Sequence, residues 1–181
     1  MKAKLFLISL CTLAATIAAA GADAEASTSA TYVLDHIALG SNIKDVIGSK
    51  GQPDLHSSFT YQWSNATGGI TTVLVDSTGA IVLIDVLAGK NEKRSIDAPG
   101  GGGILGESGH INVVTPADAT PGDWCGAGLI GSPCWAYVMP GGVELVTNFG
   151  KDNGLADWAL TELILARRDV LLSSGRVIAQ P

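Results

Sequence analysis

Residues 70–87 read ITTVLVDSTGAIVLIDVL, two apolar runs rich in Val, Ile and Thr with a polar Asp-Ser-Thr-Gly segment between them. β-Branched side chains favour strands because they pack well on the pleated surface of a sheet. A four-residue turn that ends in glycine is typical of the connection in a β-hairpin. The stretch therefore predicts two antiparallel strands, over 70–75 and over 80–87.

The sequence before this hairpin predicts a third strand and one helix. Tyr61 and Trp63 alternate with polar residues, which is typical of a strand with one buried face. Over 42–50 the apolar residues fall on one helical face, with Ser41 as the expected N-cap and Gly51 as the expected end. Together these segments predict a three-stranded meander packed on one short helix.

The same order of features recurs later in the chain. Both halves contain a Leu-Gly step, a Gly-x-Pro, an aromatic pair, a Gly-Gly turn and a further glycine, although the spacing drifts. In the second half, residues 143–149 and 156–165 correspond to the hairpin strands. Periodicity alone leaves 156–165 open, because its apolar residues also fit a helix that continues to Leu172.

These recurring motifs predict an α+β fold of two tandem units. Each unit is expected to be a short helical segment packed on a three- to four-stranded antiparallel meander. We expect the first unit over 25–89 and the second over 104–181. The glycine-rich segment 90–103 is expected to be a linker between them.

The beginning of the chain, over 1–24, has the pattern of a secretory signal peptide. Lys2 and Lys4 precede an apolar stretch, and an Ala-Asp-Ala cleavage site follows it. We therefore expect an exported protein, in the periplasm or outside the cell, and no later run is long enough to span a bilayer. The formal net charge of −6 and the lack of long Lys/Arg clusters argue against nucleic acid as a partner.

Two cysteines, Cys125 and Cys134, remain after the signal peptide in an oxidising compartment, where a disulfide is the expected state. Their spacing is not the Cys-x-x-Cys of redox-active motifs. His36, His56 and His110 are scattered, so no zinc site is predicted. We expect a structural disulfide that holds an insertion to the aromatic strand of the second unit, with free or intermolecular thiols as the alternative.

Five short motifs of the first half carry a resemblance to a known fold. They are Leu39-Gly40-Ser41, Asp45-Val46, Gly51-Gln52-Pro53, Tyr61-Gln62-Trp63 and Asp76-Ser77-Thr78-Gly79. In this order they resemble the fold shared by the β-lactamase inhibitory proteins and the SmpA/OmlA-type outer-membrane assembly lipoproteins. The resemblance covers 37–87 well and 104–165 poorly. It implies a non-enzymatic binding module, an inhibitor or an envelope-assembly accessory, whose partner is another envelope or secreted protein.

The resemblance also implies where such a module binds. In the inhibitory proteins a concave sheet face rich in aromatic residues grips a protein partner. The matching positions here are Tyr61, Trp63, Trp135 and Tyr137, and large aromatic side chains are effective anchors in interfaces. The alternative is that these four residues belong to the core beneath the helix.

The sequence contains no convincing catalytic set, metal site or cofactor motif. Residues 106–110 read GESGH, which lacks the last glycine of a nucleophile elbow. Glu162 is one of several scattered acidic residues that we expect to be solvated. A small secreted hydrolase that uses Ser108 or His110 is one alternative function, and a structural envelope protein without a specific ligand is another.

Overall fold

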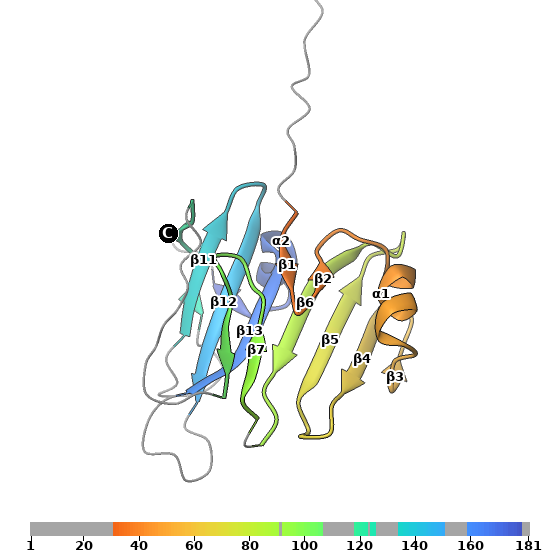
Figure 1. Ribbon diagram of the computed structural model, residues 1–181. Helices are drawn as coiled ribbons and strands as arrows, with labels where there is room; N and C mark the ends of the chain where they lie inside the picture. Colours follow the sequence, from red (N-terminus) through yellow and green to blue (C-terminus); the bar gives the residue numbers. More distant parts are fainter. Residues whose placement is uncertain are drawn as a thin grey trace, which may run out of the picture.

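The structure is a computed structural model, and it describes residues 31–90, 92–106, 118–122, 124–125, 134–150 and 159–178. The predicted signal peptide lies outside these residues. About half of the described residues are in strands, and the largest assembly is a broad antiparallel sheet (Figure 1).

Among the described residues, the two halves of the sequence contribute four strands each to this sheet. The first half gives β3 (Leu55–His56), β4 (Thr60–Ser64), β5 (Ile70–Val75) and β6 (Ile81–Leu87). The second half gives β9 (Thr120–Pro121), β11 (Cys134–Met139), β12 (Val143–Gly150) and β13 (Ala159–Arg167). Their order is β3-β4-β5-β6-β13-β12-β11-β9. The predicted hairpin is confirmed, and β13 shows that the open segment 156–165 contains a strand.

The expected fold, α+β with two tandem helix-on-meander units, is wrong. The protein is mostly β, and its two meanders join into one sheet because β6 pairs with β13, with Ile84 opposite Leu165. The described residues contain two helices, α1 (Ile43–Lys50) and α2 (Arg168–Ser173). The second helix follows its meander instead of preceding it.

The physical reason lies in β6, whose residues are buried on both sides of the sheet from Ile81 to Val86. An edge strand with two apolar faces would leave its backbone N–H and C=O groups unpaired beside apolar surface. A continuous apolar run of this kind is typical of a central strand. Pairing with β13 makes β6 central and thereby removes the boundary between the two expected units.

The front face of the sheet, marked by Val73, Ile84 and Leu165, packs against α1 and two small hairpins. The hairpins are β1 (Val33–Leu34) with β2 (Ile37–Ala38), and β7 (Arg94–Ile96) with β8 (Gly103–Leu105). Figure 1 draws α1 and β7 on the near side of the sheet. The segment 90–103, expected to be a linker, contains β7 and contributes the buried Ile96 to this core.

The back face, marked by Leu83, Val146 and Ile164, carries a second and smaller core. It packs against α2 and against β10 (Trp124–Cys125) and β14 (Val177–Ile178), which pair antiparallel with each other. Leu171 of α2 and Val177 of β14 are buried in this core. The sheet is therefore covered on both sides, but by different parts of the chain.

Helix α1 begins at Asn42, not at the expected Ser41. The Asn42 side chain accepts a hydrogen bond from the Lys44 N–H at 3.0 Å, whereas the Ser41 hydroxyl donates to the Ala38 carbonyl. Gly51 ends the helix as predicted, with φ of 89° and its N–H bonded to the Ile47 carbonyl. No helix in the part of the chain described here is long and apolar enough to cross a membrane.

Candidate functional site

Two rows of directly opposed residues cross the sheet from β4 to β11, and the four aromatic candidates are their members on these two strands. Beyond them, His56 of β3 lies opposite Tyr61, and Pro121 of β9 lies opposite Tyr137. One row is Tyr61, Val73, Ile84, Leu165, Leu145 and Tyr137, and the other is Trp63, Thr71, Val86, Leu163, Thr147 and Trp135. Directly opposed residues project to the same side of a sheet, so all four aromatic side chains belong to the front face. Five interstrand spacings separate β4 from β11 by about 24 Å.

The middle of both rows is closed to solvent. Ile84 and Leu165 have no exposed surface, because α1 and the two hairpins pack over them. The four aromatic residues consequently form two pairs at opposite margins of the front face instead of one continuous surface.

Tyr61 and Trp63 form the first pair, and they are partly buried against the front core. The Trp63 indole Nε1–H donates to the Gly51 carbonyl at the end of α1, at 3.0 Å. The Tyr61 ring lies 6.1 Å from the ring of His56, centroid to centroid. These contacts hold both side chains to neighbouring elements, which favours a role in packing for this pair.

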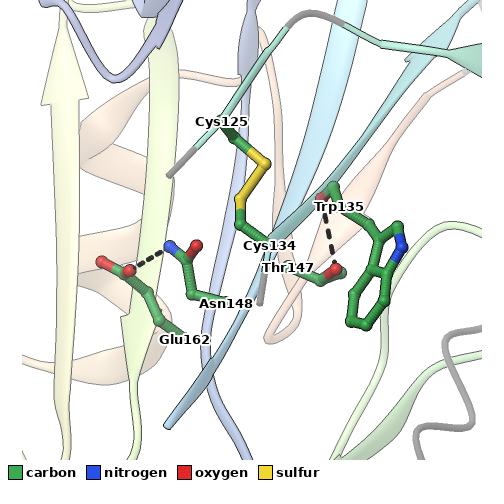
Figure 2. The surroundings of a disulfide bond; sticks show 6 residues. All are labelled: Cys125, Cys134, Trp135, Thr147, Asn148 and Glu162. Carbon is green, nitrogen blue, oxygen red and sulfur yellow. Dashed lines mark hydrogen bonds between the residues drawn. A yellow bond between two sulfur atoms is a disulfide. The ribbon is translucent and has the colours of Figure 1, made fainter. Parts of the chain in front are cut away.

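Trp135 and Tyr137 form the second pair, on β11, the strand next to the short edge strand β9. Trp135 is the most exposed of the four aromatic candidates, with 38% of its surface accessible, whereas Tyr61, Trp63 and Tyr137 are half-buried. Its indole packs edge-on against Phe149, with centroids 5.0 Å apart and planes at 81°. The Trp135 carbonyl accepts a hydrogen bond from the Thr147 hydroxyl (Figure 2). Trp135 therefore presents an aromatic surface to solvent in a fixed orientation.

The two cysteines lie beside this tryptophan. Cys125 on β10 and Cys134 on β11 are at disulfide distance, with Cα atoms 5.8 Å apart, which agrees with the predicted disulfide (Figure 2). Since β10 also pairs with β14, the cross-link connects the end of the described chain to the outer part of the sheet. The segment 126–133 between the cysteines lies outside the described residues.

Removing the cross-link is expected to destabilise the fold. Replacing both Cys125 and Cys134 by serine should lower the free energy of unfolding by about 3 kcal/mol, because the loop of about ten residues becomes unconstrained in the unfolded chain. Urea unfolding followed by circular dichroism measures the change. Mass spectrometry of the unreduced native protein supplies the control, and two free thiols would contradict the assignment.

Sequence patterns did not predict a pair of carboxylates that lies on the back face. Asp85 of β6 and Glu162 of β13 are diagonal neighbours, because Asp85 lies opposite Ile164 and Glu162 lies opposite Leu87. The Arg176 guanidinium lies 2.9 Å from the Asp85 carboxylate and 3.6 Å from that of Glu162. Glu162, expected to be solvated, is thus largely enclosed, with 23% of its side chain exposed. The available signal was an acidic residue inside the apolar run IVLIDVL.

The surroundings of this pair favour a bound proton. Burial, and then the negative charge of Glu162, raise the pKa of Asp85 from 3.8 to about 7, although Arg176 opposes the shift. Asn148 of β12 donates a hydrogen bond from Nδ2 to Glu162 at 2.5 Å. The Asp85 carboxyl therefore keeps its proton to a higher pH than an exposed aspartate does.

A second buried charge cluster lies beneath the front hairpins. Asp35, 3% exposed, accepts hydrogen bonds from Lys50 at 3.0 Å, from Arg94 at 2.5 Å and from the Thr71 hydroxyl at 3.1 Å. Arg94 also donates to the buried Glu92 at 2.9 Å. Burial alone would raise the pKa of Asp35, but the bonds and charges of Lys50 and Arg94 lower it below its ordinary value. This cluster joins the turn between β1 and β2 to α1, β5 and β7.

The described residues bear on the metal question only in part, and not on the hydrolase alternative. No group of three or more His, Cys, Asp or Glu side chains within it could hold a metal ion. Ser108 and His110, the residues of the hydrolase alternative, lie outside the described residues. Comparisons with protein-family models, with curated proteins and with solved structures find no match to this chain.

Proposed function

We propose that this chain is an exported, non-enzymatic protein-binding module that engages another envelope or secreted protein through the aromatic-bearing face of its sheet. The observation that carries the proposal is the surface of Trp135. A large aromatic side chain that is both exposed and fixed in place is the kind of residue that dominates binding energy at protein interfaces.

The contacts of Trp135 explain why it suits this role. Its packing on Phe149 and the bond from Thr147 restrict the side chain and its strand before any partner arrives. A partner that covers the indole consequently loses little additional conformational freedom on binding. The adjacent link between Cys125 and Cys134 holds the neighbouring backbone in the same way.

The other three aromatic residues are assigned smaller roles in binding than Trp135. Tyr137 lies two residues further along β11, points to the same face and is half-buried. Tyr61 and Trp63 stand at the opposite margin and are held against the front core. We therefore assign the anchor to Trp135, the flank of the interface to Tyr137 and mainly a packing role to Tyr61 and Trp63. The inhibitor or envelope-assembly type of partner follows from the sequence resemblance.

Trp135→Ala is expected to weaken capture of the partner from an envelope extract by at least about tenfold, as is typical for truncation of an anchor residue. The purified mature chain is immobilised, and bound proteins are quantified by mass spectrometry. Leu172→Ala is the matched control, because Leu172 is a 36% exposed apolar residue on α2 at the back face. Circular dichroism confirms that both variants fold.

The comparison between the two variants decides the proposal. A partner retained by Leu172→Ala and lost by Trp135→Ala supports it. Equal capture by the wild-type chain and by Trp135→Ala, or no protein captured above a blank resin, would favour the structural envelope protein without a specific ligand.

A further inference from the structure

The cover of the back face ends between β6 and β5. Residues 81–86 of β6 are buried on both sides of the sheet. In β5 burial alternates along the strand, with Thr71, Val73 and Val75 buried on the front and the residues between them partly exposed on the back. Among the described residues, the buried members of the back core come from β6, β12, β13, α2 and β14. The back face of β3, β4 and β5 is therefore open to solvent.

The register defines the residues of this open surface. Gln62 lies opposite both Leu55 and Thr72, and Thr72 lies opposite Asp85 on the back face. Side chains on one face alternate along each strand. The open patch therefore consists of Leu55, Thr60, Gln62, Ser64, Ile70, Thr72 and Leu74.

The open patch carries no charged side chain, and its Leu55 is 67% exposed. Depletion of charged residues is the compositional feature that marks the core of a protein interface. The chain as a whole is acidic, with a formal net charge of −6. Two copies can therefore approach each other across this patch without the direct opposition of like charges.

The adjoining part of the back face is raised by a C-terminal cap, which consists of α2, β14 and the turn between them. Figure 1 draws α2 behind the sheet. Leu171 and Val177 of the cap are buried against the sheet, whereas residues 172–175 are exposed and uncharged. The charge of Arg176 is paired with Asp85. A layer packed on a sheet stands about 10 Å above it, so the back face has a raised part beside an open part.

The size of the open patch limits what can occupy it. Three strands about 4.8 Å apart, with five or six residues in each longer strand, cover about 250 Å². Each partner in a stable complex buries roughly 800 Å², so this patch alone is too small to hold an unrelated protein. In a two-fold dimer the cap of each copy covers the patch of the other. Each copy then buries about 500 Å², and the total of about 1,000 Å² reaches the lower limit for a specific interface.

We propose that the open patch is a dimerisation surface, on which a second copy of this chain, related by a two-fold axis, places its C-terminal cap. The contact is self-complementary, because the raised part of each copy lies over the open part of the other. The small interface makes the dimer weak, with a dissociation constant on the order of 10–100 μM. Since Trp135 belongs to the front face, the dimer does not depend on the proposed function and carries this residue on both outer sides.

Analytical ultracentrifugation of the mature chain between about 1 and 300 μM tests the proposal, and the average mass should rise from one chain toward two. Leu55→Asp and Gln62→Arg should each raise the dissociation constant by at least about tenfold, because each places a charge in the neutral patch. Ile104→Asp is the matched control, since Ile104 is 42% exposed on β8 of the front hairpin, and it should dimerise like the wild type. Circular dichroism checks that all variants fold.

Hydrogen exchange of the unsubstituted chain locates the contact independently of any variant. Between the lowest and the highest concentration, peptides 55–64 and 168–178 should both gain protection by at least about threefold, because one carries the patch and the other the cap. Peptide 94–105, from the front hairpin, should not change.

Three results would overturn the proposal. The first is a single-chain mass at every concentration. The second is a dimer that Ile104→Asp weakens as much as Leu55→Asp does, since the contact would then lie elsewhere. The third is a gain of protection in only one of the two back-face peptides, which contradicts the pairing of patch with cap. Trp135→Ala should dimerise normally, so loss of partner capture and loss of dimerisation are separate results.

Discussion

Replacing Asp35 by asparagine is expected to lower the free energy of unfolding by about 3 kcal/mol at pH 7, because two partly exposed cations lose their buried counter-charge and the hydrogen bonds to it. Lys50 and Arg94 both pair with this carboxylate, which has almost no exposed surface. The backbone tolerates the change. Asp35 has a φ of 53°, and asparagine is among the few other residues that adopt this conformation readily.

The pH dependence of this effect has a defined sign. Because Lys50 and Arg94 lower the pKa of Asp35, its stabilising contribution is present above its unfolded value of 3.8. The contribution is lost as the pH falls through the lower folded value. Urea unfolding at pH 7 and at progressively lower pH should therefore show a difference between wild type and Asp35→Asn that shrinks in acid.

Asp97→Asn is the control for this experiment. The Asp97 carboxylate accepts a hydrogen bond from the backbone N–H of His36, which follows Asp35 in the chain. The Asp97 side chain is nevertheless 40% exposed. Its replacement should change the stability by less than about 1 kcal/mol, as is usual for exposed polar pairs. Equal stability of wild type and Asp35→Asn at pH 7 would show that the buried cluster does not stabilise the fold.

Local sequence patterns were sufficient for the parts of the fold that depend on neighbouring residues. The two apolar runs around Gly79 gave β5 and β6, and the alternation of Tyr61 with Trp63 gave β4. The end of α1 at Gly51 was also predicted, because one residue with positive φ determines it. The start of α1 was missed by one position, since Ser41 and Asn42 are both good caps and only their neighbours decide between them.

The arrangement of the meanders could not be obtained in this way. It depends on the pairing of β6 with β13, whose residues are about eighty positions apart, and short-range periodicity carries no information on such a contact. One signal was present in the sequence. The run from Ile81 to Ile84 is apolar at every position, which is incompatible with a strand at the edge of a half-covered sheet.

In the candidate site too, local patterns identified individual residues but not the arrangement that depends on distant contacts. The sequence selected Tyr61, Trp63, Trp135 and Tyr137, and the register of the sheet places all four on one face, in two adjacent rows. It could not rank them by exposure, because that depends on which distant elements cover the front face. The carboxylate pair of Asp85 and Glu162 was missed for a related reason. It is assembled across β6 and β13, a long-range strand pairing that local patterns do not predict.

Replacing Ile84 by alanine is expected to lower the free energy of unfolding by about 4 kcal/mol, as for other large-to-small changes in a fully enclosed core. Ile84 has no exposed surface and lies opposite Val73 on one side and Leu165 on the other. The cavity would therefore open at the seam between the two meanders. Urea unfolding followed by circular dichroism measures the loss. Leu87→Ala, at the 40% exposed end of the same strand, is the control and should cost less than about 1 kcal/mol.

The location of the destabilisation within the sheet is more informative than its size. The pairing of β6 with β13 lies between β4–β5 on one side and β11–β12 on the other. If the sheet unfolds as one unit, both meanders should lose protection at the same urea concentration. Hydrogen exchange of peptides 60–75 and 134–150 during unfolding separates the two halves. If Ile84→Ala shifts the first peptide alone, the halves unfold as independent units and the pairing of β6 with β13 contributes little to stability. A common shift means that this central pairing makes the two meanders one cooperative body.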